Sequence, residues 1–297
     1  MVKKSFLYLS KIIKIRKSES MDYELMPDKI ATRENPKSKL SFVPYVSDAP
    51  LVKGKSQLTQ HMISLIMKGE KHIYSDGKPI VINPANILLL SAGNYIFTER
   101  PNGNPGIRSI LVFFDDDFLQ DAVRNSIKLP KDPAKKTPNV LVPKDDYINN
   151  FIGSVQSLIN DTVFTESMQI AKLNELLVYL CMRFPEELNN FQNVSVAKTP
   201  EERIQNVMQQ NVFNNFSVSE LAFFCHMSLS TFKRKFQQIY KQQPAKWMQQ
   251  QRLITAADLL KNGSKPSEIY MQVGYENHSS FSQAFKTHFG KLPKDYN

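Results

Sequence analysis

The sequence predicts a two-domain α+β protein, in which a strand-rich N-terminal half precedes an all-α C-terminal third. Short apolar runs separated by turn residues fill residues 41–114, and amphipathic helical patterns fill much of residues 144–184. Residues 200–297 are helical throughout and contain one pattern twice. The length of 297 residues suits two domains of about 150 residues each.

The strand-like region alternates apolar segments with turn signals. Asp76-Gly77 is a strong hairpin signal, and Asn83-Pro84-Ala85-Asn86 separates two apolar runs. The Pro- and Gly-rich loop 100–106 precedes the last strong strand, IRSILVFF (107–114). Several short strands at such intervals predict an antiparallel barrel or sandwich.

Helical patterns begin after this strand. Asp115-Asp116-Asp117 supply an N-cap and first-turn acids for a helix that ends near residue 126. Residues 128–143 are rich in Pro and Lys and predict a loop. Residues 144–160 and 166–184 predict two amphipathic helices, and 185–199 predict a polar linker.

The formal charge of +10 lies at the two ends of the chain. Residues 1–20 carry six basic and one acidic residue, residues 21–199 carry 20 of each, and residues 200–297 carry 12 basic and seven acidic residues. Segregated positive charge indicates nucleic acid or an anionic surface as partner. We expect residues 1–40 to be a flexible arm or, at their beginning, a non-native start.

Several classes of protein are not indicated. No apolar run reaches 18 residues, and the apolar core at the N-terminus is too short for a signal peptide, so we expect no membrane segment. Cys181 and Cys225 are expected to be free thiols in a reducing cytoplasm. The sequence lacks phosphate-loop, dinucleotide-binding and zinc-protease motifs. We therefore predict no catalytic residue, no metal and no cofactor.

The repeated pattern in the C-terminal region predicts two helix-turn-helix units. SVSELAFFCHMSLSTFKRKFQQIY (217–240) and KPSEIYMQVGYENHSSFSQAFKTHF (265–289) each read as a short helix, a turn and a longer helix. In the longer helices, Phe232 and Phe236 match Phe281 and Phe285, and this spacing buries one helix face. The opposite faces are polar, as a helix in the major groove requires. The predicted helices are 200–212, 217–225, 229–240, 244–262, 265–273, 278–289 and a short one after Pro293.

With these motifs, residues 200–297 resemble the DNA-binding domain of the AraC/XylS family of bacterial transcription regulators. The resemblance includes Phe232 through Phe236, Arg252-Leu253, Val273-Gly274-Tyr275 and Phe289-Gly290. In that family a long helix, here 244–262, joins two helix-turn-helix units that occupy successive major-groove segments. Lys241 stands where the family usually has Gly, and Tyr270 replaces a small residue, so both must be accommodated.

The resemblance implies DNA contacts from the two longer helices. The implied base contacts are Ser230, Lys233, Arg234, Gln237, Ser279, Ser282 and Gln283. The implied phosphate contacts are Ser228, Thr231, Lys235, Lys286 and Arg252. Arg252 is equally well interpreted as a structural ion-pair former. The second helix offers only Ser and Gln for base reading, so we expect it to read less sequence directly.

Residues 41–184 resemble the regulatory half of the same family, a cupin-like β-barrel followed by helices. The resemblance implies a small-molecule effector inside the barrel, and the candidate lining residues are His61, His72, Tyr74, Tyr95, Phe97 and Arg100. An ordinary core with surface polar groups is the alternative. Residues 172–177 resemble a segment of these regulators on helix 166–184. Its apolar stripe is expected to form a dimer interface or to pack on its own domain, and consists of Ile170, Leu173, Leu176, Leu177 and Leu180.

Together these observations predict a sequence-specific DNA-binding transcription regulator, with residues 185–199 linking the two halves. We expect an activator that works as a homodimer with RNA polymerase on the bacterial nucleoid, without catalytic activity. The alternatives are control by a protein partner, constitutive action, a cupin-type enzyme fused to a DNA-binding domain, and a DNA-repair adaptor. Zinc ligands would be expected for the last of these, and the five histidines lack zinc spacing.

Overall fold

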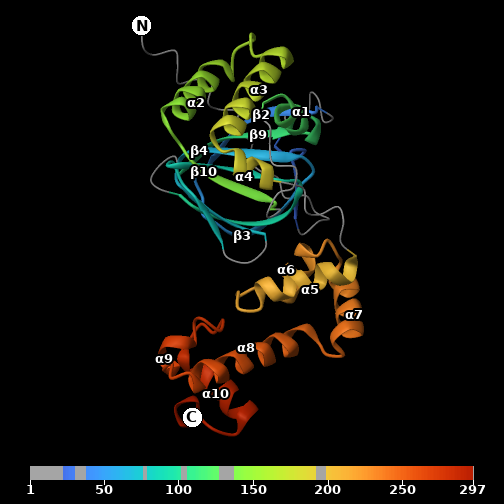
Figure 1. Ribbon diagram of the computed structural model, residues 1–297, viewed down its shortest axis with the longest axis vertical. Coiled ribbons are helices and arrows are strands. Elements are labelled where there is room, and N and C mark those ends of the chain that lie inside the picture. Colours follow the sequence, from blue (N-terminus) through green and yellow to red (C-terminus); the bar gives the residue numbers. More distant parts are fainter. Residues whose placement is uncertain are drawn as a thin grey trace. The chain divides into compact units, whose positions relative to one another are not determined.

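The computed structural model describes residues 23–30, 38–75, 79–101, 106–126, 137–191 and 199–296. The chain divides into two compact units, with the main boundary between Val196 and Ala197 (Figure 1). The N-terminal unit holds the strands and helices α1–α4, and the C-terminal unit is helical. This order confirms the predicted α+β fold class.

Two five-stranded sheets form the centre of the N-terminal unit. Sheet A has the strand order β1-β3-β8-β5-β6, and sheet B has the order β10-β7-β4-β9-β2. Neighbouring strands are antiparallel, apart from β1 and β3, which run parallel. Sheet A comprises β1 (Glu24–Met26), β3 (Leu51–Leu58), β5 (Glu70–Tyr74), β6 (Ile80–Ile82) and β8 (Gly93–Arg100). Sheet B comprises β2 (Leu40–Ser47), β4 (His61–Lys68), β7 (Asn86–Leu90), β9 (Ile107–Phe114) and β10 (Asn139–Pro143).

Sheet B is the middle layer of this unit. On β7, Leu88 and Leu90 belong to the core shared with sheet A, whereas Ile87 and Leu89 belong to the core under the helices. A strand that is buried on both faces needs apolar residues at every position. The run ILLL therefore lacks the alternation of polar and apolar residues that marks a half-exposed strand.

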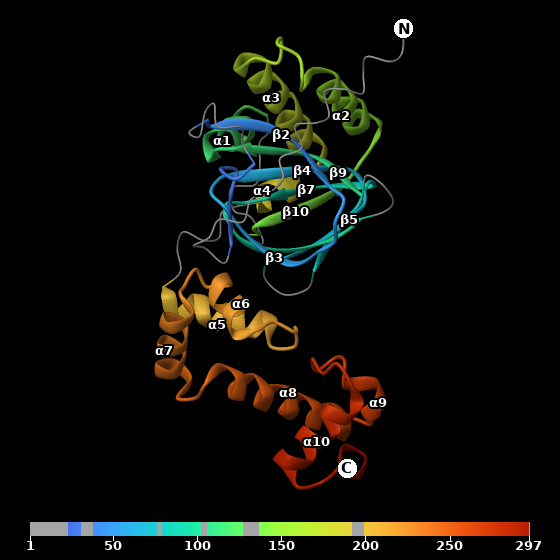
Figure 2. The same ribbon diagram turned by 180° about the vertical axis from the view of Figure 1, so that it is seen from behind.

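Four helices cover the outer face of sheet B (Figures 1 and 2). They are α1 (Asp116–Ser126), α2 (Asp146–Leu158), α3 (Glu166–Arg183) and α4 (Pro185–Asn190). Asp145 caps α2, since its side chain accepts a hydrogen bond from the Ile148 backbone N–H. Among the described residues, no helix is long and apolar enough to cross a membrane.

The N-terminal unit extends beyond the predicted range of 41–184. Residues 24–26 form β1 within the predicted arm, and α4 with the buried Phe191 occupies the start of the predicted linker. Residues 139–143 form β10, although they were predicted as loop. These segments have three to six residues, which is too short for a periodic pattern to stand out. The first 22 residues, the turn at Asp76-Gly77 and residues 192–198 of the predicted linker lie outside the described residues.

The helices of the C-terminal unit follow the sequence prediction closely. They are α5 (Pro200–Asn211), α6 (Val218–Phe224), α7 (Leu229–Tyr240), α8 (Pro244–Lys261), α9 (Pro266–Ile269) and α10 (His278–Phe289), followed by a 3₁₀ turn at Pro293–Asp295. The helix predicted over 265–273 is shorter, because the chain continues from Ile269 as turns. There the Gly274 N–H bonds to the Met271 carbonyl, which ends the α-helical pattern.

Candidate nucleic-acid interface

The first helix-turn-helix unit is formed by α6 and α7. Ser217 and Glu220 make a reciprocal capping box at the start of α6, and Ser228 caps α7 by accepting from the Thr231 N–H. Phe232 and Phe236 are fully buried, which fixes the rotation of α7 about its axis. The opposite face of α7 is exposed and carries four predicted base-contacting residues, Ser230, Lys233, Arg234 and Gln237.

The second unit is formed by α9 and α10. Asn277 caps α10 by accepting from the Ser280 N–H at 2.8 Å, and Phe281 and Phe285 are fully buried. Ser279 and Gln283 are exposed, as is Lys286. Ser282 is half-buried, and its hydroxyl lies 3.5 Å from the His278 ring nitrogen Nδ1. Three of these four side chains therefore share the open face of α10.

The predicted phosphate contacts divide into three kinds. Ser228 and Thr231 lie at the exposed start of α7, where main-chain N–H groups favour an anion. Lys235 instead turns toward α5, and its Nζ lies 2.7 Å from the Glu201 carboxylate. This pairing lowers the pKa of Glu201 through a hydrogen bond from Lys235. Lys235 is half-buried between Phe232 and Phe236 and already paired with a carboxylate, and its assignment to phosphate stays a prediction.

Arg252 does not face solvent as a phosphate contact would. Its guanidinium donates to the carbonyls of Val212, Asn214 and Gly274, at 2.6, 2.7 and 3.0 Å. Burial lowers the pKa of this group. Arg252 is therefore bonded within the protein, but it is not the ion-pair former of the alternative prediction, since its acceptors are neutral carbonyls.

The two departures from the family pattern are both accommodated. Lys241 ends α7 in the left-handed conformation, with φ 55°, at the place where the family usually has Gly. Tyr270 packs against the core of the second unit and meets the His278 ring edge-on at 5.9 Å between centroids. The larger side chain at position 270 is therefore covered by the first residue of α10.

A polar groove runs between α8 and α10, with a volume of about 880 Å³. Its α8 side carries Lys246, Gln249 and Gln250, which the sequence analysis did not single out, and its α10 side carries Ser279, Gln283 and Thr287. No acidic side chain is among the described residues that line it. Gln249 and Gln250 follow Lys246 by three and four residues, which places all three on one polar edge of α8. This spacing could have identified them from the sequence.

Most predicted effector residues lie outside the space between the sheets. His61 faces the helices, where it contacts Asp116 at 3.1 Å and the rings of Phe114 and Phe191. Side chains alternate along a strand, so His72, Tyr74 and Arg100 occupy the outer face of sheet A. Tyr95 and Phe97 do point between the sheets. The prediction was thus wrong for four of the six residues.

The space between the sheets contains polar groups that the sequence analysis missed. Lys71 and Glu99 form a buried ion pair at 2.9 Å on sheet A, and the Tyr45 hydroxyl of sheet B donates to Glu99 at 3.0 Å. Burial, then the Glu99 charge, raises the pKa of Tyr45. The buried hydroxyls of Ser64 and Ser109 have no hydrogen-bond partner among the described residues. Lys71 and Glu99 were not singled out because charged residues in strands usually face solvent. Glu99 is, however, on the same face of β8 as Tyr95 and Phe97, and this alternation was the available signal.

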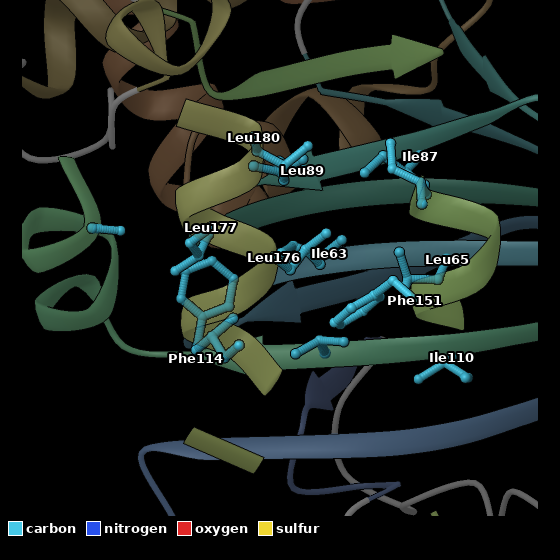
Figure 3. Packing of buried hydrophobic residues seen from close by; sticks show 14 of the residues in the cluster. Ile63, Leu65, Ile87, Leu89, Ile110, Phe114, Phe151, Leu176, Leu177 and Leu180 are labelled. Atoms are coloured by element: carbon cyan, nitrogen blue, oxygen red, sulfur yellow. The ribbon is translucent and has the colours of Figure 1, made fainter. Parts of the chain in front are cut away.

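The apolar stripe of α3 packs on its own domain. Leu173, Leu176, Leu177 and Leu180 are fully buried in the core with sheet B, and Ile170 is half-buried. Figure 3 shows Leu176, Leu177 and Leu180 in this core. The prediction of a dimer interface on this stripe was therefore wrong, and the alternative of internal packing is correct. The exposed face of α3 carries a different set of residues, Met168, Ala171, Glu175, Val178 and Met182.

Comparison with known proteins matches both units. A family model described as the ExsA N-terminal regulatory domain matches residues 61–191, and a helix-turn-helix domain model matches residues 221–297. The virulence regulon transcriptional activator VirF of Yersinia enterocolitica is 22% identical over 240 residues, which cover 79% of this chain and 88% of VirF. The regulator ExsA of Pseudomonas aeruginosa is 22% identical over 237 residues, which cover 78% and 84%.

Among solved structures, fatty acid-bound ToxT of Vibrio cholerae is 15% identical, covers 86% of this chain and 93% of its own, and has a TM-score of 0.39. The two family models place a regulatory module and a helix-turn-helix module in this one chain. Two helix-turn-helix units joined by α8 follow that regulatory domain in this structure. The chain belongs to the AraC/XylS family of DNA-binding transcription regulators.

Proposed function

We propose that the protein activates transcription by reading DNA with α7 and α10 in successive major-groove segments. The observation that carries this proposal is the pair of recognition helices, each with its aromatic face buried and its polar face open. On α7, Lys233 and Arg234 suit the acceptor atoms of guanine, and on α10, Gln283 suits adenine. The similarity to VirF, a transcriptional activator, supports activation over repression.

Selection of bound duplexes from a random-sequence library tests this proposal. The selected DNA should contain two conserved boxes about 34 Å apart, which is one turn of duplex, and footprinting should protect both. Arg234→Ala should weaken binding to the selected site more than binding to random DNA. Arg183→Ala, which removes an equal charge from the exposed end of α3, is the matched control. Equal losses on both DNAs would contradict base reading by Arg234.

We infer that the protein forms a homodimer through the exposed face of α3. Met168, Ala171, Glu175, Val178 and Met182 follow the alternating spacing of three and four residues that is typical of paired helices. Met182 is 69% exposed, which is unusual for a large apolar side chain. Val178→Glu together with Met182→Glu should convert a dimer to a monomer in sedimentation experiments. A dimer that survives both changes would place the interface elsewhere.

We propose that the regulatory domain takes a small polar effector between its two sheets. The unpartnered hydroxyls of Ser64 and Ser109 lie in the layer that contains Tyr45, Lys71 and Glu99. Effector screening by thermal shift should find compounds whose effect Ser64→Val and Ser109→Val abolish. A response that both variants retain would favour another site or the alternative of control by a protein partner.

We further propose that the protein acts in the bacterial cytoplasm on nucleoid DNA, contacts RNA polymerase and has no catalytic activity of its own. The regulator names of its relatives support this assignment. Metal analysis of the purified full-length protein tests the alternative of a cupin-type enzyme. Stoichiometric iron, manganese or zinc would overturn the assignment.

A further inference from the structure

Arg252 lies in α8, the helix that joins the two helix-turn-helix units, and its side chain bonds to both. Nε and Nη2 donate to the carbonyls of Val212 and Asn214, in the segment that leads into α6. Nη1 donates to the carbonyl of Gly274, in the turn of the second unit. All three nitrogens of one planar group are therefore occupied, two by the first unit and one by the second.

The two segments that Arg252 connects also contact each other. A Cβ atom on Gly274 would lie 2.6 Å from the Phe213 carbonyl oxygen and 3.0 Å from the Arg252 Cζ. The Asn215 side-chain amide donates to the Glu276 carboxylate at the edge of this contact. Segment 212–215 and turn 274–276 are thus packed together, with the guanidinium between them and no room for a side chain at position 274.

Removing part of a guanidinium from water is costly unless its donors are satisfied, and here neutral carbonyls satisfy those of the half-buried Arg252. Its planar fork holds three acceptors in fixed directions, whereas a lysine ammonium at the same place can reach fewer of them and imposes no plane. These bonds restrict the rotation of one unit relative to the other. If α8 were the only connection, bending of the helix and of the turns at its two ends would allow that rotation. The geometry therefore points to a role in orientation.

We propose that Arg252 is a positioning residue that fixes the angle and spacing between α7 and α10, and so sets the spacing of the two operator boxes. The part about the operator rests on the proposed function, in which both helices read DNA. Inserting one base pair between the boxes rotates one against the other by about 35° and moves it by about 3.4 Å. Two units held at a fixed angle cannot contact both boxes after this insertion, whereas two units that move relative to each other can.

The first test measures the orientation without DNA. Spin labels at Gln238→Cys and Lys291→Cys, both exposed, report the distance between the two units by pulsed electron resonance in the full-length protein. The native Cys181 and Cys225 are fully buried, and burial raises their pKa to about 11 and 12, so they react slowly with the label. Arg252→Lys should broaden the distance distribution. Arg203→Lys, which alters a bond to the Cys225 carbonyl within the first unit, should leave it unchanged.

The second test varies the spacing of the boxes in the DNA selected by the wild-type protein. One inserted base pair should cost the wild type about 10- to 100-fold in affinity, since it misplaces several contacts of one unit, and should cost Arg252→Lys less than about threefold. The slope of affinity against salt should be the same for both proteins, because Arg252 contacts no phosphate. A lower slope with an unchanged spacing preference would overturn the proposal.

If Arg252→Lys does not fold, Asn215→Ala is the milder variant, which removes the bond to Glu276 and should broaden the distances less. Unchanged distances in every variant that folds would overturn the proposal. Failure of the wild type to select any DNA would overturn the proposed function alone, because the distance measurement needs no DNA.

Discussion

In the first helix-turn-helix unit the turn contains His226 at φ 55°, whereas the second unit has Gly274 at φ 81° at the matching position. The ends of the recognition helices repeat this difference, with Lys241 at φ 55° after α7 and Gly290 at φ 76° after α10. A residue with a Cβ atom costs about 1–2 kcal/mol in this conformation, and glycine avoids that cost. The same backbone plan is therefore more strained in the first unit than in the second.

The two units also differ on their open faces. The face of α7 carries Lys233 and Arg234, while α10 has Ser282 and Gln283 at the matching positions, with Lys286 one turn further on. Cations close to the helix centre favour tight binding to guanine and phosphate, whereas neutral side chains depend on alignment. We therefore expect the first unit to supply most of the affinity for DNA and the second to depend on its placement by Arg252.

The largest expected effects come from the aromatic pairs, in which the two units are alike. Phe236→Ala and Phe285→Ala should each lower the free energy of unfolding by about 3–5 kcal/mol, because both rings are fully buried. Chemical denaturation of each variant measures this loss. Gln238→Ala, on the exposed face of α7, is the control. A much smaller loss at Phe285 would mean that the second unit folds more loosely.

The close packing around Gly274 distinguishes the turn of the second unit from the helix end at Gly290. Gly274→Ala should destabilise the protein by about 2–4 kcal/mol, through its positive φ and through a clash with the Phe213 carbonyl. Gly290→Ala has the same sign of φ but open space around the added Cβ, so only the conformational cost should appear. Equal losses in thermal unfolding would contradict the close contact at position 274.

Base reading should divide unequally between the helices. Arg234→Ala should cost about 1–3 kcal/mol of specific binding, as expected for loss of a bidentate guanine contact. Gln283→Ala should cost less, because α10 relies on weaker neutral contacts. Titration of both variants against the selected site and against random DNA measures the difference. A larger loss of specific binding in Gln283→Ala than in Arg234→Ala would mean that α10 reads more of the DNA sequence than α7.

The smallest expected effect is a gain in stability. Lys241→Gly should stabilise the protein by about 0.5–1 kcal/mol, because relief of the left-handed strain exceeds the added freedom of the unfolded chain. Gly290→Lys is the mirror substitution and should destabilise. Thermal melting of both variants tests the pair, and a loss of stability in Lys241→Gly would show that the Lys side chain makes a compensating contact.

The sequence predicted the C-terminal unit well because its signals are local. Phe232, Phe236, Phe281 and Phe285 repeat at helical spacing, and Ser228 and Asn277 are typical caps. The contacts of Lys235 with Glu201, and of Arg252 with three carbonyls, join residues more than 20 positions apart. No periodic pattern records such pairs, so the roles of both residues appeared only in the structure.

Prediction was weaker in the N-terminal unit for a related reason. Strand parity would have excluded His72 and Arg100 from the interior once Tyr95 and Phe97 were placed there, because β5 and β8 pair in register. The register itself depends on long-range pairing and could not be read from the sequence. The leucines of α3 were equally ambiguous, since an apolar stripe does not reveal whether it faces a second copy or its own sheet.

The burial of sheet B on both faces has a consequence for how the protein tolerates change. Strands β4, β7 and β9 offer few positions where a side chain can be enlarged, shortened or made polar without disturbing one of two cores. The outer face of sheet A is less buried, with Ile96 as a fully buried exception, and should accept more substitutions. A deep mutational scan should therefore find that most substitutions in β4, β7 and β9 reduce function. Substitutions that change ligand preference should be found more often in sheet A.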